Sequence, residues 1–233
     1  MRPVLTSSEH LAQFARRAAA SIPQGSRVLD AGAGDSPYRD YFAHAEYEAA
    51  DVCLRPAHQY AHVQHVCSLT EIPVDDRRFD LVLCTQVLEH VPEPSSVLKE
   101  LHRVLKPGAQ LWISAPLSFH EHEKPHDYFR YTQFGWRHLM QSAGLEIVEM
   151  GWVQGYLGTV AYQLNQARHD LPSNPAQLGG GARGLFAASL VTLCKPMFAV
   201  LAYLFSRLDY RHRVTSSGHP LDYWLVARRP LET

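Results

Sequence analysis

The stretch VLDAGAGDSPYRDYF, residues 28–42, places Asp30 at the end of a short apolar run, two residues before a glycine-x-glycine turn formed by Gly32 and Gly34. A turn of this kind between a strand and a helix points backbone N–H groups and the positive end of the helix at a ligand. The pattern predicts a strand over 27–32 and a helix that begins at Pro37. A dinucleotide fingerprint has its third glycine where this chain has Pro37, so the turn disfavours a pyrophosphate ligand.

Apolar runs and helical repeats alternate along most of the remaining chain. Helices alternating with strands predict an open parallel sheet that is covered on both faces and binds ligands at the carboxyl ends of its strands. The fold expected is α/β, a doubly wound, mostly parallel seven-stranded sheet. Beyond the first strand, the expected strands are 47–52, 62–66, 79–85, 110–116, 145–153 and 222–229, and the main expected helices are 11–18, 94–106 and 133–143.

Residues 154–220 interrupt this alternation, so we expect a single domain over 1–233 with a helical insertion before the last strand. The apolar run 185–205 has about the length of a membrane span, roughly 20 residues. Lys195 and Pro196 divide it into two halves that are too short to cross. We therefore expect a pair of helices buried over the substrate cleft or in a homodimer interface. The alternative is peripheral contact with an anionic membrane, favoured by the flanking Arg183, Arg207, Arg211 and Arg213.

The composition restricts the partners and the compartment. Lysine and arginine number 22 against 23 acidic residues, so no excess of positive charge favours nucleic acid as a partner. The four cysteines form no CxxC pair, which indicates a reducing compartment. The first 17 residues lack the apolar run of a signal peptide. The expected location is cytoplasmic, at the membrane periphery if the insertion contacts lipid.

Two segments carry a resemblance to a known family. VLDAGAGDSPY (28–38) and SLTEIPVDDRRFDLVLCTQVLEHVPEPSSVLKELHRVLKPGAQLWIS (68–114) resemble the class I S-adenosylmethionine (SAM)-dependent methyltransferases, in particular the small-molecule, type 11-like domains. The resemblance extends over about 26–153. It implies SAM as the cofactor and a Rossmann-like methyltransferase fold.

The resemblance also implies cofactor-binding residues. It places Asp30, Gly32 and Gly34 at the methionine end of SAM, and Asp51, 19 residues beyond Gly32, at the ribose hydroxyls. Ser68 and Leu69 would contact the adenine, and Gln86 would line the floor of the site. Ser68 stands where the family often has an aspartate, and a serine hydroxyl is a weaker acceptor for the adenine amino group.

The loop PLSFHEHEKPHDYFRYT, residues 116–132, follows the fifth strand at the same edge of the sheet. A neutral imidazole is a suitable base for an acceptor that must lose a proton. We predict His126 as that base, with Asp127 orienting its ring, and His122 as a further catalytic candidate. No metal is assigned, although the spacing would also allow a cluster of His120, His122 and His126. The other interpretation of these histidines is that they are solvated or support the site indirectly.

The predicted function is SAM-dependent methyl transfer to a small-molecule, sugar or lipid-linked acceptor, with oxygen favoured over nitrogen. One alternative is an NAD(P)-dependent oxidoreductase, which Asp30 and Pro37 oppose. The other is a non-catalytic, methyltransferase-like binding or scaffold protein that attaches to a partner through the apolar insertion.

Overall fold

The computed structural model describes residues 6–54 and 60–231, and the chain divides into two compact units. The sheet unit comprises residues 10–153 and 222–233, and the helical unit comprises residues 1–9 and 154–221. The predicted insertion, 154–220, lies in the helical unit. The ends of the predicted domain, 1–5 and 232–233, lie outside the described residues.

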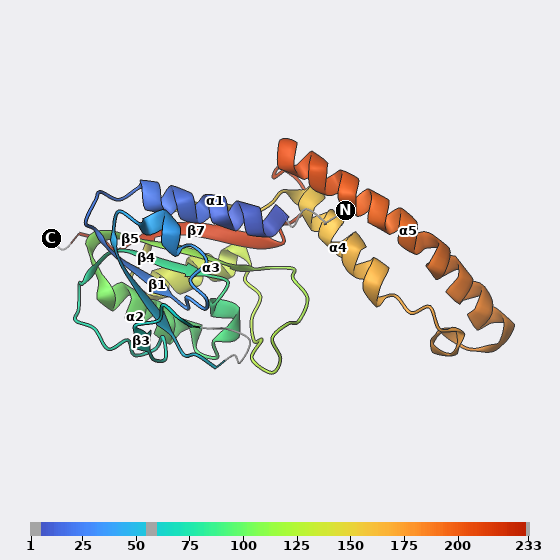
Figure 1. Ribbon diagram of the computed structural model, residues 1–233, viewed down its shortest axis with the longest axis horizontal. Helices are drawn as coiled ribbons and strands as arrows, with labels where there is room; N and C mark the ends of the chain where they lie inside the picture. Colours follow the sequence, from blue (N-terminus) through green and yellow to red (C-terminus); the bar gives the residue numbers. More distant parts are fainter. Residues whose placement is uncertain (1–5, 55–59, 232–233) are drawn as a thin grey trace. The chain divides into compact units, whose positions relative to one another are not determined.

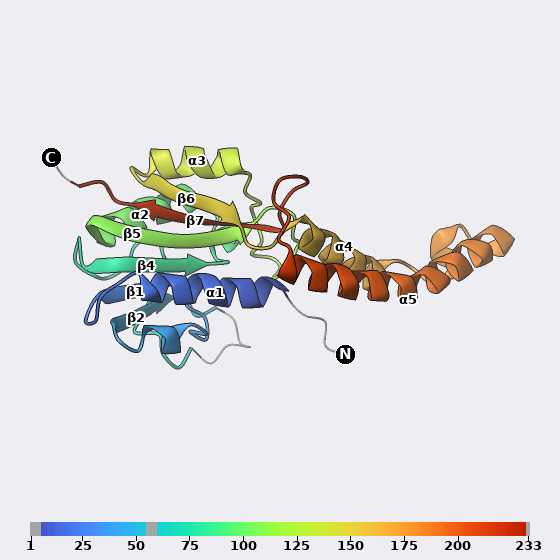
Figure 2. The same ribbon diagram turned by 90° about the horizontal axis from the view of Figure 1, so that it is seen from above.

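The sheet unit is built on seven strands in the order β3-β2-β1-β4-β5-β7-β6, and most of this order can be followed in Figure 2. The pairings among β1 to β5 are parallel, whereas β7 runs antiparallel to both of its neighbours. This confirms the doubly wound α/β prediction. The strands are β1 (Arg27–Ala31), β2 (Glu46–Asp51), β3 (His65–Val66), β4 (Phe79–Thr85), β5 (Leu105–Pro116), β6 (Glu146–Trp152) and β7 (Asp222–Arg228).

Helices cover both faces of this sheet (Figure 1). On one face α2 (Pro94–Val104) and α3 (Gln133–Ser142) bury apolar side chains against the strands, and on the other α1 (Thr6–Ala20) does so. The apolar residues of α2 recur every three or four positions, which places them on one side of the helix. The Thr132 side chain accepts a hydrogen bond from the N–H of Gly135, confirming the predicted cap of α3.

The segment after the glycine turn differs from the prediction. A helix was expected to begin at Pro37, but only a short 3-10 turn, η1 (Arg39–Phe42), forms there. Ser36 adopts a left-handed conformation with φ 53°, and its N–H donates to the carbonyl of Ala33. The chain therefore closes a tight turn at the position where a helix cap was predicted.

The helical unit contains α4 (Tyr156–Asp170), η3 (Pro175–Leu178) and α5 (Gly181–Arg211), with α4 packed along α5 (Figure 1). The prediction of two separate helices over 185–205 is wrong, because α5 continues through Pro196. One internal proline costs about 3 kcal/mol, and the leucines and alanines on both sides favour a helix. Asp209 of α5 accepts a hydrogen bond from the N–H of Gly155 at the start of α4, which links the two helices.

Large apolar side chains of α5 are exposed, and the predicted roles of the insertion, over the substrate cleft, in a homodimer interface or on a membrane, stay predictions. Phe186 is 73% exposed and Leu193 is 76% exposed. By length and composition, α5 is the one helix in the described part of the chain that could cross a membrane. The exposed large hydrophobic residues of α5 are Leu185, Phe186, Leu190, Leu193, Met197, Val200, Leu204, Leu208 and Tyr210.

Candidate functional site

The carboxyl ends of β1, β2 and β4 lie side by side at one edge of the sheet. A non-glycine residue with positive φ follows each of these strands: Ser36 at 53°, Cys53 at 56° and Gln86 at 55°. Such conformations are uncommon for residues with a side chain and cluster at functional sites. Their concentration here, where the sequence placed its ligand-binding residues, makes this edge the candidate site.

The glycine turn is held from two sides. Gly32 has φ +79°, and a Cβ built on it would lie 2.4 Å from a methyl carbon of Val87, which follows β4. Gly34, with φ 53°, donates its N–H to Asp51 Oδ2 at 2.9 Å. Glycine is therefore required at position 32 by backbone conformation and by close packing.

The two predicted acidic residues have different environments. Asp51, at the end of β2, is partly exposed and also accepts the N–H of Cys53 at 2.7 Å. Asp30 is buried at the end of β1 and accepts a hydrogen bond from the Tyr47 hydroxyl. Burial raises the pKa of Asp30 to about 7, and the nearby Asp51 charge adds to the shift while Tyr47 opposes it. A cation at this position would favour the ionised form of Asp30.

The remaining predicted cofactor residues follow β3 and β4. The Ser68 hydroxyl contacts Thr70 Oγ1 at 2.8 Å and accepts the Thr70 N–H at 3.2 Å, so it shapes a turn. Leu69 is buried in the core. Gln86 donates from Nε2 to Ser114 Oγ at 3.2 Å, which connects β4 to β5. The structure thus gives each residue a local role, and their contacts with a cofactor stay predictions.

The histidine loop is organised by Asp127, although not as predicted. The Asp127 carboxylate forms two 2.7 Å bonds with the Arg130 guanidinium and accepts the backbone N–H of His122 at 2.8 Å. Arg130 holds the Asp127 pKa well below its usual range. Among the described residues, the ring that Asp127 approaches is that of His122, at 3.4 Å. The predicted orientation of the His126 ring by Asp127 is therefore wrong.

His122 and His126 differ in their surroundings. Burial lowers the pKa of His122, although the Asp127 charge opposes this, so its ring is neutral near pH 7. The exposed His126 ring lies 3.2 Å from the Tyr128 hydroxyl. The sequence places His126 beside Asp127, but the fold gives the carboxylate to His122, because the guanidinium of Arg130 fixes its direction.

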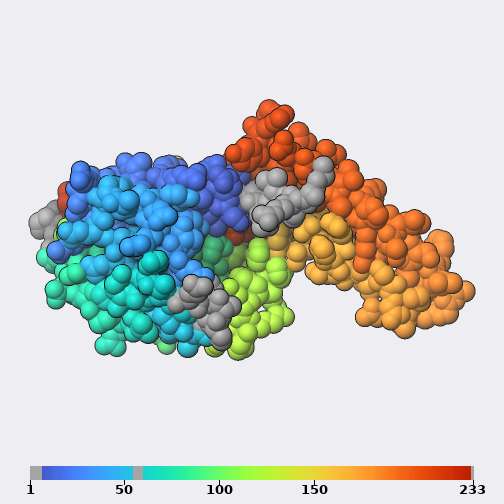
Figure 3. Space-filling model, in the orientation of Figure 1, coloured from blue at the N-terminus to red at the C-terminus, as the bar shows by residue number. Residues whose placement is uncertain are grey.

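Hydrogen bonds to backbone carbonyls fasten the loop to η2 (Leu88–His90), the short turn after β4. The N–H of Tyr128 donates to the Glu89 carbonyl at 2.8 Å, and His90 Nδ1 lies 2.7 Å from the His126 carbonyl. The Tyr131 hydroxyl donates to the Leu88 carbonyl at 2.8 Å. Atoms of the loop, in yellow-green, reach the molecular surface in Figure 3. The loop and η2 thus form one structure next to the glycine turn, because Val87 packs on Gly32.

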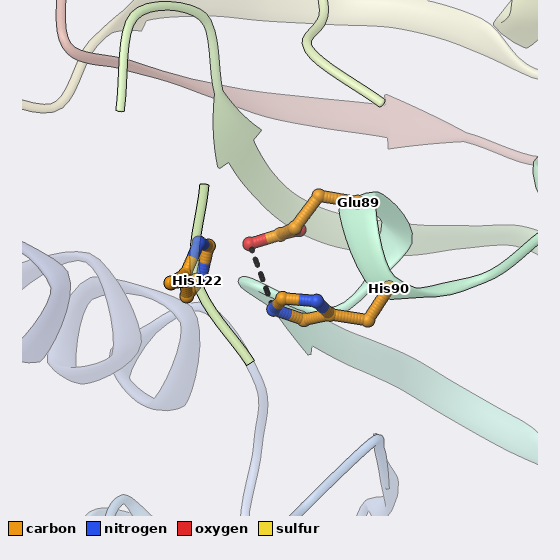
Figure 4. A group of neighbouring side chains, drawn as sticks. All are labelled: Glu89, His90 and His122. Atoms are coloured by element: carbon orange, nitrogen blue, oxygen red, sulfur yellow. Dashed lines mark ion pairs between the residues drawn. The ribbon is translucent and has the colours of Figure 1, made fainter. Parts of the chain in front are cut away.

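Glu89 is a site residue that the sequence analysis missed. Its side chain is completely buried, and neither carboxyl oxygen has a hydrogen-bond partner among the described residues. Burial raises its pKa to about 8. Figure 4 shows the carboxyl group directed at the rings of His90 and His122. An acid followed by a histidine, only a few residues after a buried strand, was the signal available in the sequence.

Comparisons with known proteins identify a domain family and related enzymes. A family model described as a methyltransferase domain matches residues 6–150. A ubiquinone biosynthesis O-methyltransferase of Pseudomonas entomophila is 32% identical over 95 residues, which is 41% of this chain and 37% of that enzyme. The corresponding enzyme of Pseudomonas syringae is 54% identical over 37 residues, 16% of each chain. The chain thus aligns with well under two thirds of the length of these curated relatives.

Solved structures share the fold at low sequence identity. The [4+2]-cyclase SpnF has a TM-score of 0.57 at 20% identity, with 96% of this chain and 81% of that chain covered. A phosphoethanolamine N-methyltransferase 2 of Haemonchus contortus, solved with SAM, has a TM-score of 0.56 at 16% identity, with 96% of this chain and 52% of that chain covered. At these identities the similarity establishes the fold.

Proposed function

The chain belongs to the SAM-dependent methyltransferase family, whose domain model matches residues 6–150, and we propose that it transfers a methyl group to oxygen. The proposed acceptor is a small-molecule, sugar or lipid-linked compound. Two curated relatives are named as O-methyltransferases, which supports oxygen over nitrogen. The observation that carries the cofactor side is the glycine turn, closed onto Asp51 at the sheet edge.

On the cofactor side, we assign Asp51 to the ribose hydroxyls and Asp30 to the methionine end. An ionised Asp51 can accept further hydrogen bonds, because each carboxylate oxygen has two acceptor sites and the structure occupies them only in part. We further assign the backbone of the turn at Gly32 and Gly34 to the methionine end, Gln86 to the floor of the site, and Ser68 with Leu69 to the adenine.

On the acceptor side, we assign His122 and Asp127. Methyl transfer is a displacement in which the acceptor oxygen attacks the methyl carbon and the sulfonium loses its charge, so the protein contributes mainly positioning and the removal of a proton. His122 is neutral near pH 7 and held by Asp127, which suits this task. His126 remains a weaker candidate, since its exposed ring faces Tyr128.

The exposed apolar face of α5 supports contact with an anionic bilayer and thereby a lipid-linked acceptor. The arginines near both ends of the helix, Arg183, Arg207, Arg211 and Arg213, complement anionic lipid headgroups. We therefore propose a cytoplasmic protein that binds the membrane periphery through α5. If the protein does not bind vesicles, the alternative is a homodimer that buries the same face of α5.

The reaction is tested by supplying SAM with a CD₃ group to the purified protein together with a lipid extract and, separately, a water-soluble metabolite extract. We expect one product that carries CD₃ on oxygen, identified by mass spectrometry, and at subsaturating SAM a much lower yield of it with the Asp51→Ala variant. A labelled nitrogen would contradict the proposed acceptor atom. SAM binding without any labelled product would favour the non-catalytic alternative.

A further inference from the structure

The side chains of Glu89, His90 and His122 form a cluster that the reaction as described does not explain. Each residue offers one ligand atom, and these atoms lie within 4.8 Å of one another (Figure 4). Glu89 and His90 come from η2, whereas His122 comes from the histidine loop, 32 residues further along the chain. The hydrogen bonds that fasten the loop to η2 bring the three together.

The Glu89 carboxyl group points to a missing ligand. A buried carboxyl without a hydrogen-bond partner is rare, because its desolvation is not compensated. Both Glu89 oxygens are in this state, and Nε2 of the His90 ring lies 3.8 Å from Oε1, which is too far for a hydrogen bond. A bound cation would compensate this burial.

The imidazole rings of His90 and His122 are oriented by hydrogen bonds that suit coordination of a cation. A carbonyl oxygen can only accept, so His90 Nδ1 donates to the His126 carbonyl, and Nε2 is the ring nitrogen directed at the carboxyl groups of Glu123, at 3.3 Å, and Glu89, at 3.8 Å. In His122 the carbonyl of His120, 3.2 Å from Nδ1, places the hydrogen in the same way, and Asp127 lies beside it. Metal-binding histidines are typically oriented by a carbonyl or carboxylate at the other ring nitrogen.

We infer that Glu89, His90 and His122 form a binding site for a divalent transition-metal ion. Two imidazoles and one carboxylate are a common ligand set for zinc, iron and manganese, and they leave coordination positions open. Tetrahedral ligands at about 2.0–2.1 Å from the metal lie about 3.4 Å apart, so the three side chains need to approach one another only slightly. This differs from the sequence analysis, which assigned no metal and considered only His120, His122 and His126 as an alternative.

The ion has a consequence for methyl transfer that rests on the proposed function. An ion held by Glu89, His90 and His122 would lower the pKa of an acceptor hydroxyl bound at an open position, and the hydroxyl proton would pass to water. The resulting oxygen then forms its bond to the methyl carbon, while the carbon–sulfur bond breaks and its electron pair returns to sulfur. In this account His122 acts on the acceptor by holding the ion.

Metal binding is tested without SAM. The full-length protein is freed of metal with a chelator and titrated with Zn²⁺ by calorimetry and with Co²⁺ by visible absorption. We expect one site per chain, and a loss of at least tenfold in affinity in Glu89→Gln, His90→Ala and His122→Ala. The matched controls His120→Ala and His126→Ala should change affinity less than twofold. Circular dichroism identifies any variant that fails to fold, and three ligand variants keep the test valid if one does.

Several results would overturn the inference. They are the absence of a stoichiometric site, equal affinity in the three ligand variants and the wild type, or a loss confined to His120→Ala and His126→Ala, which would indicate the alternative cluster. The role in transfer is tested separately with chelated protein. We expect methyl transfer to fall and to return with the ion, while SAM affinity stays constant. Since the metal titration contains no SAM, a failure of the metal site and a failure of the proposed function are distinguishable.

Discussion

The carboxylate of Asp51 accepts the backbone N–H of Gly34 across 2.9 Å, which fastens the end of β2 to the glycine turn after β1. One side chain therefore fixes the shape of the turn and also presents acceptor oxygens at the edge where we place the cofactor ribose. Loss of Asp51 should thus affect the cofactor site twice, through the ligand and through the turn.

Gly32→Ala should destabilise the protein. The left-handed backbone at φ +79° costs a residue with a side chain about 1–2 kcal/mol, and the clash with Val87 adds about 1–3 kcal/mol. We expect the free energy of unfolding to fall by about 2–5 kcal/mol in urea titration. The double variant Gly32→Ala/Val87→Ala should be closer to the stability of Val87→Ala than the single variant is to the wild type. A fully stable Gly32→Ala would show that the turn is not constrained as described.

The buried Asp30 should make stability depend on pH. Its folded pKa of about 7 lies above its usual value of 3.8, so the folded state holds a proton that the unfolded state has released. The contribution of Asp30 to the free energy of unfolding is therefore most favourable below pH 4. It decreases as pH rises from 4 to about 7, by on the order of 4 kcal/mol at most. Thermal unfolding between pH 5 and pH 8 should show this decrease in the wild type and a smaller one in Asp30→Asn. Parallel curves for the two proteins would contradict the assignment.

The acceptor assignment predicts a difference between two histidines of the same loop. His122→Ala should lower acceptor methylation by about 10²–10⁴, the range typical of lost proton-transfer or positioning groups, with SAM affinity unchanged. His126→Ala, whose ring is exposed, should lower it less than tenfold. The measurement is kcat with saturating SAM and the identified acceptor. The reverse order would restore the base that the sequence suggested.

The exposed face of α5 predicts binding to vesicles that contain anionic lipid. We expect the protein to sediment with them at low salt and to be released as salt screens the arginines. The variant Arg207→Glu/Arg211→Glu should sediment less, while Arg27→Glu, outside the helical unit, should behave as the wild type does. A protein that stays in the supernatant and elutes as a dimer in size-exclusion chromatography would place a second copy on this face.

Strands such as β1 and β4 could be predicted from sequence because each is a short apolar run between turn signals. The cap at Thr132 could be predicted for a similar reason, since its hydrogen bond to Gly135 is local. The helix expected at Pro37 did not form, because the left-handed conformation of Ser36 redirects the chain. Residue propensities do not predict that a serine adopts this conformation. The length of α5 was underestimated, because Pro196 was given more weight than the helix formers around it.

The site shows where sequence reasoning stopped. Asp127 was recognised, but adjacency in the chain suggested His126 as its partner, whereas Arg130 turns the carboxylate to His122. Glu89 was missed because its significance lies in its burial, which depends on the loop that folds over η2. Spacing identifies residues on one strand or helix, and contacts between η2 and a loop 32 residues away require the fold.

The central claim is that this edge of the sheet binds SAM, and isothermal titration calorimetry tests it most directly. Wild-type protein titrated with SAM should bind one molecule per chain, and NAD should give no heat of binding. In Asp51→Ala the affinity for SAM should fall by about 1.5–3 kcal/mol for each lost charged hydrogen bond, or at least tenfold, and Asp51→Asn should lie between. Binding of NAD without binding of SAM, or unchanged SAM affinity in Asp51→Ala, would contradict the account.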